Sequence, residues 1–206
     1  METRPSAVEI ITLWSSLFLE ADLPDHGEPT RRLIDLAATH RDDGVFSIDD
    51  PGVVWLKRQI AHGVGAYFSR SGRESAPEWG ARGRFDVQEP GGYRPLANEP
   101  GAFLAGMYVL QWSPEQGVGG GRDDALPGCV SFYDPRVAMN MNAIKRDPYH
   151  RYHHSLLPRP GLLSMWPAHI SYFVHPNRSR EPTMAVRFGV QLHGPSSGNP
   201  RGPDGR

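Results

Sequence analysis

The chain has 206 residues, of which 38% are hydrophobic and 22% charged, and its formal net charge is −1. This length and balance are typical of one globular domain with a buried core. A near-neutral charge argues against nucleic acid as a partner, and the short apolar runs argue against a signal peptide or a membrane span, which needs about 20 apolar residues. We therefore expect a cytoplasmic protein.

The first 75 residues predict a strand and two helices. Glu9–Glu20 is short and apolar and fits either a strand or a helix. Glu28–His40 has leucines and an alanine at helical spacing. A second helix is predicted to begin at the cap-like Asp50 and Pro51, because apolar residues then recur at near-helical spacing as far as Phe68.

From Trp79 onward, short β-rich runs alternate with Gly/Pro turns, which is typical of a β-sandwich or barrel. We predict a single domain over 1–193, with a strand and helical layer over 1–78 and a jelly-roll core over 79–193. The glycine-rich segment 113–128 is too long for a tight hairpin and is expected to be a loop. Residues 194–206 are predicted to be a disordered tail. The single cysteine, Cys129, cannot form an internal disulfide and is expected to be a small buried core residue.

Five stretches in a characteristic order carry a resemblance: "PGGYRP", "PGAFLAGMYVLQW", "FYDPR", "PRPGLLSMWP" and "VHPNRSREP". Over roughly 14–191 the chain resembles a bacterial family of 2-oxoglutarate/Fe(II) oxygenases. The resemblance implies a double-stranded β-helix, a cupin-like jelly roll. It also implies a facial triad of two histidines and a carboxylate that binds iron, and an arginine that pairs with 2-oxoglutarate.

The chain departs from this pattern at the positions that the resemblance assigns to the cofactors. Ala97 stands at the first histidine, Glu99 at the second ligand, Tyr172 at the distal histidine and Thr183 at the arginine. No histidine occurs between His62 and His150, so a shift of the alignment does not restore the first ligand. We therefore expect no metal and no cofactor, with Fe(II) and 2-oxoglutarate as the alternative.

Other polar groups are expected in the barrel. Glu99 and Tyr172 are predicted to line one cavity as base and acid, or else to bond to each other and fill an inactive site. Arg187 is expected on the same inner surface, to bind a substrate carboxylate or pair with Glu99 or Asp134. His169 and Thr183 complete the candidate substrate-binding residues.

The histidines in "DPYHRYHHSLLP" suggest a metal site, but neighbouring residues of a strand point to opposite faces. One of them, His153 rather than His154, is predicted to face the pocket as a third catalytic residue. Asp134 and Arg136 in "FYDPR" are predicted to pair and hold a turn.

Two kinds of function fit these residues. The first is a metal-independent acid/base enzyme (an epimerase, isomerase, dehydratase or cyclase) that acts on a small molecule or peptide, as in specialised metabolism. The second is a non-catalytic descendant of such an oxygenase, with a cavity that binds a ligand or partner. A 2-oxoglutarate hydroxylase with non-standard iron ligands is a further alternative. A homodimer is compatible with all three.

Overall fold

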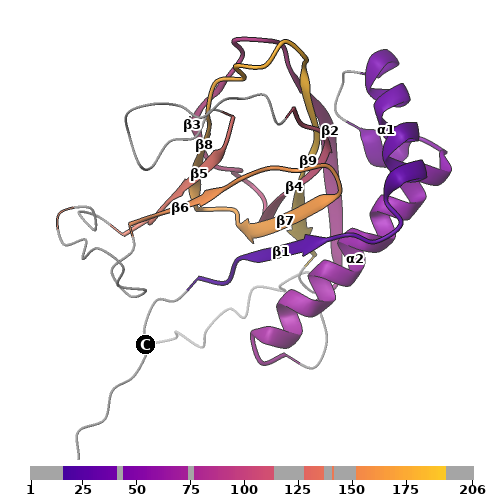
Figure 1. The fold of residues 1–206 in the computed structure, drawn as a ribbon. Coiled ribbons are helices and arrows are strands. Elements are labelled where there is room, and N and C mark those ends of the chain that lie inside the picture. Colours follow the sequence, from indigo (N-terminus) through magenta and orange to yellow (C-terminus); the bar gives the residue numbers. More distant parts are fainter. Residues whose placement is uncertain are drawn as a thin grey trace, which may run out of the picture.

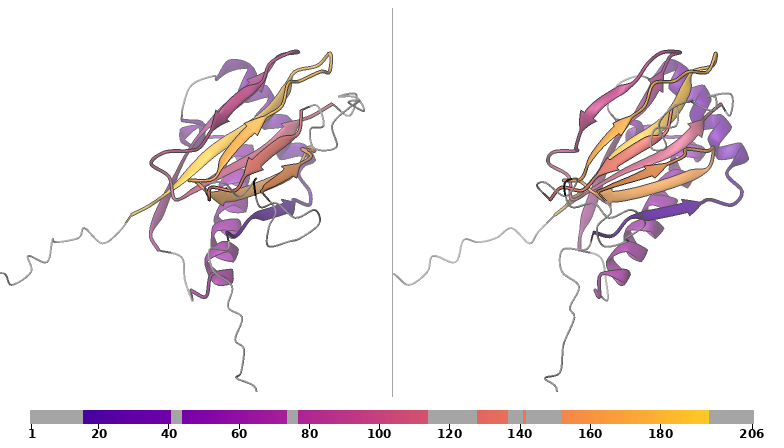
Figure 2. Two further views of the ribbon diagram at one scale, coloured as in Figure 1. Left: turned by 90° about the vertical axis from the view of Figure 1, so that its left-hand side faces the viewer. Right: turned by 60° about the vertical axis from the view of Figure 1, so that its left-hand side comes forward.

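The strands form two antiparallel sheets that face each other (Figures 1 and 2). The computed structural model describes residues 16–40, 44–73, 77–113, 128–136, 141 and 152–193. The larger sheet has the order β1-β7-β4-β9-β2 and the smaller sheet has the order β3-β8-β5-β6. The strands are β1 (Leu19–Asp22), β2 (Trp79–Gln88), β3 (Arg94–Ala97), β4 (Leu104–Gln111), β5 (Val130–Tyr133), β6 (His153–Leu156), β7 (Leu162–Pro167), β8 (Ser171–Val174) and β9 (Thr183–Leu192).

Two helices, α1 (Gly27–Thr39) and α2 (Pro51–Arg70), lie on the outer face of the larger sheet (Figure 1). A short 3-10 turn, η1 (Val45–Ser47), precedes α2. The Asp50 side chain accepts a hydrogen bond of 2.7 Å from the backbone N–H of Gly52 and thus caps α2. Both helices and the cap agree with the sequence prediction. None of the helices in the described ranges is long and apolar enough to span a membrane.

Strand alternation divides the interior into two cores, one on each face of the larger sheet. On β4, Leu104, Tyr108 and Leu110 pack against the helices, whereas Ala105, Met107 and Val109 face the smaller sheet. The first core holds the helices on the sheet, and the second fills the space between the sheets. The chain is thus mainly β with N-terminal helices and has the double-stranded β-helix fold that the resemblance implied.

Several predicted segments fall wholly or mostly outside the described residues. They include most of the glycine-rich segment 113–128, the tail 194–206 and His150. Cys129 is buried, as expected.

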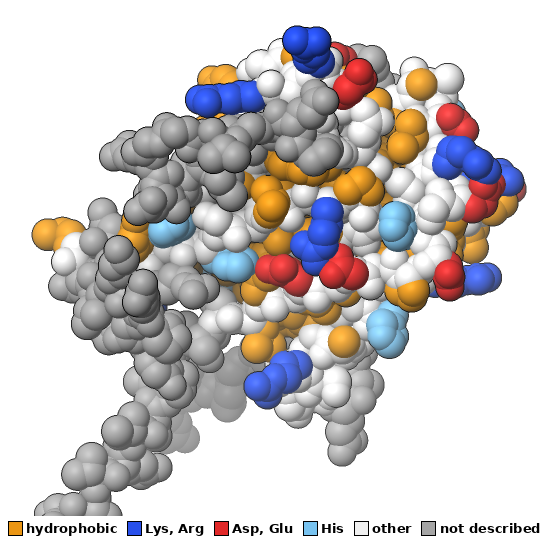
Figure 3. Space-filling model, in the orientation of Figure 1, with side chains coloured by type: hydrophobic (Ala, Val, Ile, Leu, Met, Phe, Trp, Pro, Cys, Tyr) orange, Lys and Arg blue, Asp and Glu red, His pale blue; other side chains and the backbone are white. Residues whose placement is uncertain are grey.

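On the surface in Figure 3, acidic and basic side chains lie beside one another. The Arg159 side chain donates hydrogen bonds of 2.7 and 2.6 Å to the carboxylate of Asp22 on β1.

Candidate functional site

The β3 and β8 strands bring two of the implied cofactor positions together. Ala97 is the direct cross-strand partner of Tyr172. Glu99 follows two residues after Ala97, and its backbone N–H donates to the Ala168 carbonyl at 3.1 Å. The positions that the resemblance assigns to the iron ligands therefore lie together at one end of the smaller sheet, although their side chains differ from the family pattern.

Tyr172 points between the sheets and is 2% exposed. Its ring lies against Trp166, with ring centroids 5.3 Å apart, and against Phe132 at 6.1 Å. The hydroxyl group is buried and has no hydrogen-bond partner among the described residues. Burial is the main cause that raises the pKa of this phenol above its ordinary value of 10.0, so the hydroxyl group keeps its proton at neutral pH.

Arg187 of β9 is the central cation of the site. Its guanidinium lies over the Tyr172 ring, 5.3 Å from the centroid, which is a cation–π arrangement. Nη2 donates to Glu99 Oε2 at 3.0 Å, and Nη1 lies 3.7 Å from Asp86 Oδ2. The Arg187 side chain is 7% exposed, whereas that of Glu99 is 27% exposed. Glu99 therefore faces solvent-accessible space, and a buried arginine holds it in place.

A cavity of about 270 Å³ opens beside this ion pair, and Glu99 and Arg187 both line it. Two further arginines of β2, Arg82 and Arg84, also line it. Neither was selected from the sequence, although their i, i+2 spacing in "GARGRFDV" indicates a shared strand face. Tyr172 is not among the lining residues and contacts the site through Arg187.

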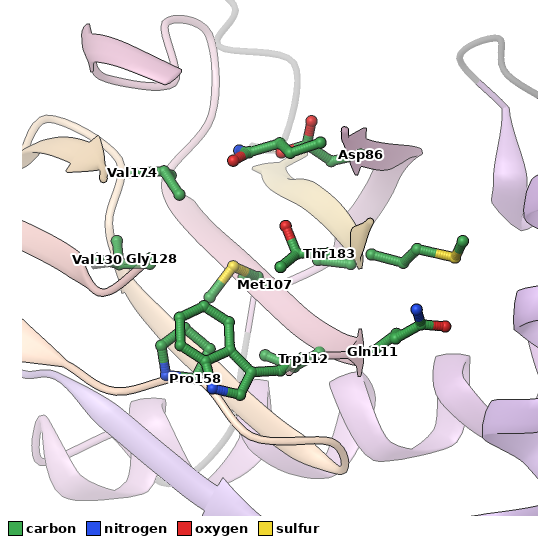
Figure 4. A pocket seen from close by; sticks show the side chains of 13 residues that line it. Asp86, Met107, Gln111, Trp112, Gly128, Val130, Pro158, Val174 and Thr183 are labelled. Atoms are coloured by element: carbon green, nitrogen blue, oxygen red, sulfur yellow. The ribbon is translucent and has the colours of Figure 1, made fainter. Parts of the chain in front are cut away.

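A second, much smaller cavity of about 30 Å³ lies between the sheets near the start of β9. Figure 4 shows Thr183 and Met107 facing it from β9 and β4, with the Trp112 ring at its side. This space is enough for one or two water molecules. Thr183 is thus separate from the larger cavity, whose residues on β9 are Arg187, Phe188, Gly189 and Gln191.

The predicted histidines lie elsewhere. His154 pairs with the inward-facing Phe132 and stacks on its ring, whereas His153 pairs with the partly exposed Tyr133. Because direct cross-strand partners share a face, His153 points away from the barrel interior, contrary to the prediction. His154 Nε2 instead lies 3.0 Å from Glu20 Oε1.

His169 is exposed in the turn between β7 and β8 and lines neither cavity. The Asp134–Arg136 pair is present as predicted, with the Arg136 side chain donating to both carboxylate oxygens. This contact is the main cause that lowers the pKa of the Asp134 carboxyl group below its ordinary value of 3.8.

Comparisons with known proteins support the fold. A Pseudomonas putida prolyl-4-hydroxylase has a TM-score of 0.54 and 12% identity, over 86% of this chain and 88% of its own. The viral collagen prolyl hydroxylase of Paramecium bursaria Chlorella virus-1, solved with 2OG, has a TM-score of 0.57 and 10% identity, over 86% and 96%. The non-heme α-ketoglutarate-dependent epimerase SnoN from nogalamycin biosynthesis has a TM-score of 0.55 and 10% identity, over 85% and 78%.

No family model matches the chain, and no curated protein matches it either. At these low identities the structural likeness concerns the fold, which is that of the 2-oxoglutarate oxygenases.

The described residues at the implied positions do not fit iron and 2-oxoglutarate. Ala97 has no donor atom, and Glu99, the one carboxylate, is held by a guanidinium that would repel a cation. Thr183 is uncharged and cannot form the ion pair that an arginine would form with a carboxylate, and the cavity beside it is far smaller than a five-carbon diacid. Among the described residues, no group of three or more His, Cys, Asp or Glu side chains is arranged to hold a metal ion.

Proposed function

We propose that the protein is an enzyme that transfers protons on a small organic molecule without a metal, in the cavity beside Glu99 and Arg187. Epimerisation, isomerisation, dehydration and cyclisation all belong to this reaction class. The observation that carries the proposal is a partly exposed carboxylate that a buried arginine orients toward a cavity. A positioned carboxylate of this kind is suited to act as a general base.

Glu99 is the proposed base, because its carboxylate lines the cavity and one of its oxygens accepts from Arg187. Arg187 can also stabilise negative charge that develops on the substrate as its proton leaves. Tyr172 keeps its own proton, and its ring supports the guanidinium. Since Tyr172 does not line the cavity, the geometry favours a positioning role for it over direct proton donation.

Hydrogen exchange from solvent tests this proposal without knowledge of the natural substrate. The purified protein would be incubated in D2O with EDTA and a panel of small carbon acids that includes carboxylates and phosphate esters. We expect protein-dependent deuterium uptake, detected by mass spectrometry, into at least one compound. Glu99→Gln should abolish the uptake, whereas Asp35→Asn, a change of an exposed carboxylate on α1, should leave it intact.

Two outcomes would favour the alternatives. A compound that binds to the cavity but never exchanges would support a non-catalytic binding protein. Turnover that requires added Fe(II) and 2-oxoglutarate would support a hydroxylase with non-standard ligands.

Iron loading provides a direct prediction. After anaerobic incubation with Fe(II) and desalting, we expect no stoichiometric iron by elemental analysis and no succinate from 2-oxoglutarate, because the implied positions provide a single carboxylate. One iron per chain, lost in Glu99→Ala, would contradict the proposed metal independence.

A further inference from the structure

We infer that Asp86 and Arg94 are positioning residues for the proposed base, Glu99. They act on it through Arg187. The inference rests on the proposed function, since it concerns how the same carboxylate is held and how readily it takes up a proton. Neither Asp86 nor Arg94 lines the cavity beside Glu99, and neither was selected from the sequence.

Four side chains of alternating charge form one continuous series of contacts. Arg187 Nη2 donates to Glu99 Oε2 at 3.0 Å, and Arg187 Nη1 lies 3.7 Å from Asp86 Oδ2. At the far end, Arg94 Nε donates to Asp86 Oδ2 at 3.2 Å, and Arg94 Nη2 donates to Asp86 Oδ1. Arg187 is therefore shared between two carboxylates, and Asp86 is shared between two guanidinium groups.

The two middle members of this series are buried. The Asp86 side chain is 9% exposed and that of Arg187 is 7% exposed, whereas that of Arg94 is 28% exposed. Buried charges interact more strongly than charges in water, and salt screens them less. A change of charge at Asp86 or Arg94 should therefore be felt at Glu99, through the buried Arg187.

The Tyr172 phenol responds to all four charges. Burial is the largest cause that raises its pKa above 10.0. The cations Arg187 and Arg94 lower this pKa, and the two anions raise it. The four charged side chains thus lie close enough together to act on one buried group.

The same contacts hold β3, the strand that leads to Glu99. Among the described strands, β3 is hydrogen-bonded only to β8, and its register is irregular between Arg94 and Ala97. Arg94 begins this strand and is bound to Asp86 on β2. Glu99 follows the end of the strand and is bound to Arg187 on β9. Ion pairs to the larger sheet therefore hold both ends of a weakly paired strand, which fixes the place of the Glu99 carboxylate.

Asp86 and Arg94 should have opposite effects on the base. A guanidinium group beside a carboxylate stabilises its charged form and makes it a weaker base. Asp86 partly neutralises Arg187, so the loss of its charge should leave Glu99 less basic. Arg94 neutralises Asp86 in turn, so the loss of its charge should leave Glu99 more basic.

Carbon-13 NMR of the glutamate carboxyl groups tests the inference without a substrate. The Glu99 signal is identified by its absence in Glu99→Gln and is followed from pH 3 to 8. In Asp86→Asn we expect the midpoint of this signal to move to lower pH, by about 0.5–1 pH unit. In Arg94→Gln it should move to higher pH by a similar amount, and the variant with both changes should lie between the two.

The ion pair of Asp22 and Arg159 provides the matched control. It has the same carboxylate–guanidinium contact but lies at β1, on the opposite edge of the larger sheet from β2. Asp22→Asn and Arg159→Gln should leave the Glu99 midpoint unchanged. Circular dichroism would establish that each variant is folded. Because Arg94 is partly exposed, Arg94→Gln provides the measurement even if Asp86→Asn does not fold.

The results separate this inference from the proposed function. Opposite shifts in a protein that exchanges no carbon acid would support the action of Asp86 and Arg94 on Glu99 and reject the acid/base enzyme. Exchange that depends on Glu99, with no shift or with shifts in one direction, would keep the enzyme and overturn the positioning roles. Where exchange occurs, its pH profile should move with the NMR midpoint, because one carboxylate governs both. A loss of stability without any shift would show that Asp86 and Arg94 are structural only.

Discussion

Tyr172 and Tyr108 are both fully buried phenols, but their hydroxyl groups have different surroundings. Tyr108 Oη lies 2.6 Å from Thr30 Oγ1, whereas Tyr172 Oη has no partner among the described residues. We predict that Tyr172→Phe changes the free energy of unfolding by less than about 0.5 kcal/mol. Tyr108→Phe should lower the free energy of unfolding by about 1–2 kcal/mol, because the buried Thr30 hydroxyl group loses its hydrogen bond to Tyr108.

Urea unfolding of the two variants measures this difference. A large loss in Tyr172→Phe would contradict the description of its hydroxyl group as unpaired. An activity change in Tyr172→Phe without a stability change would instead assign a role to the hydroxyl group, because phenylalanine keeps the ring that supports Arg187.

At the scale of the elements, α2 depends on its N-terminal cap. Asp50 accepts from the Gly52 N–H and lies 3.8 Å from Arg32 of α1, so it also connects the two helices. We predict that Asp50→Ala lowers the free energy of unfolding by about 1 kcal/mol, as replacement of an N-cap carboxylate commonly does. Thermal and urea unfolding provide the measurement.

The neighbouring acid provides the control. Asp49 is exposed and does not cap the helix, so Asp49→Ala should change the stability by no more than about 0.5 kcal/mol. Equal losses in the two variants would show that the general loss of negative charge, rather than the cap, is responsible.

The elements also show where the sequence was informative. Helical spacing and the Asp50–Pro51 start predicted α1 and α2, because both signals are local. The face of β6 was predicted wrongly, because the orientation of His153 and His154 depends on the register with β5. Arg82 and Arg84 were missed for a similar reason: their alternation is visible, but the pairing of β2 with β9 is a long-range contact.

For the whole molecule, two buried phenols predict sensitivity to alkaline pH. Burial is the first cause that raises the pKa of both Tyr108 and Tyr172 above the ordinary value of 10.0. Above pH 10 the unfolded chain therefore releases protons that the folded protein retains. The stability is fully present below pH 10 and falls as the pH rises, by up to about 1.4 kcal/mol per pH unit for each tyrosine.

Denaturant unfolding between pH 9 and 11.5 tests this expectation, with tyrosinate absorbance recorded in parallel. Tyr172→Phe and Tyr108→Phe should each make the decline less steep. An unchanged slope in both variants would show that other groups cause the alkaline loss.

The whole-molecule architecture was accessible from the sequence through the rhythm of its strands and turns and through the order of its motifs. The alternation of strands and turns indicated a jelly roll. The five quoted stretches indicated that it is the double-stranded β-helix found in 2-oxoglutarate oxygenases. The site was less accessible, because its arginines and acids lie far apart in the chain. Glu99, for instance, is 88 residues from Arg187, its hydrogen-bond partner.

The central strands β4 and β9 contribute alternate residues to the two cores. Insertion or deletion of one residue within β9 would exchange the faces of its side chains, with Arg187 turned toward the helices and Val186 turned toward the cavity. Point substitutions on the inner face do not replace any of the side chains that pack against the helices. During evolution, this barrel can therefore gain new ligands by single substitutions, whereas changes in the length of β4 and β9 should be eliminated by selection.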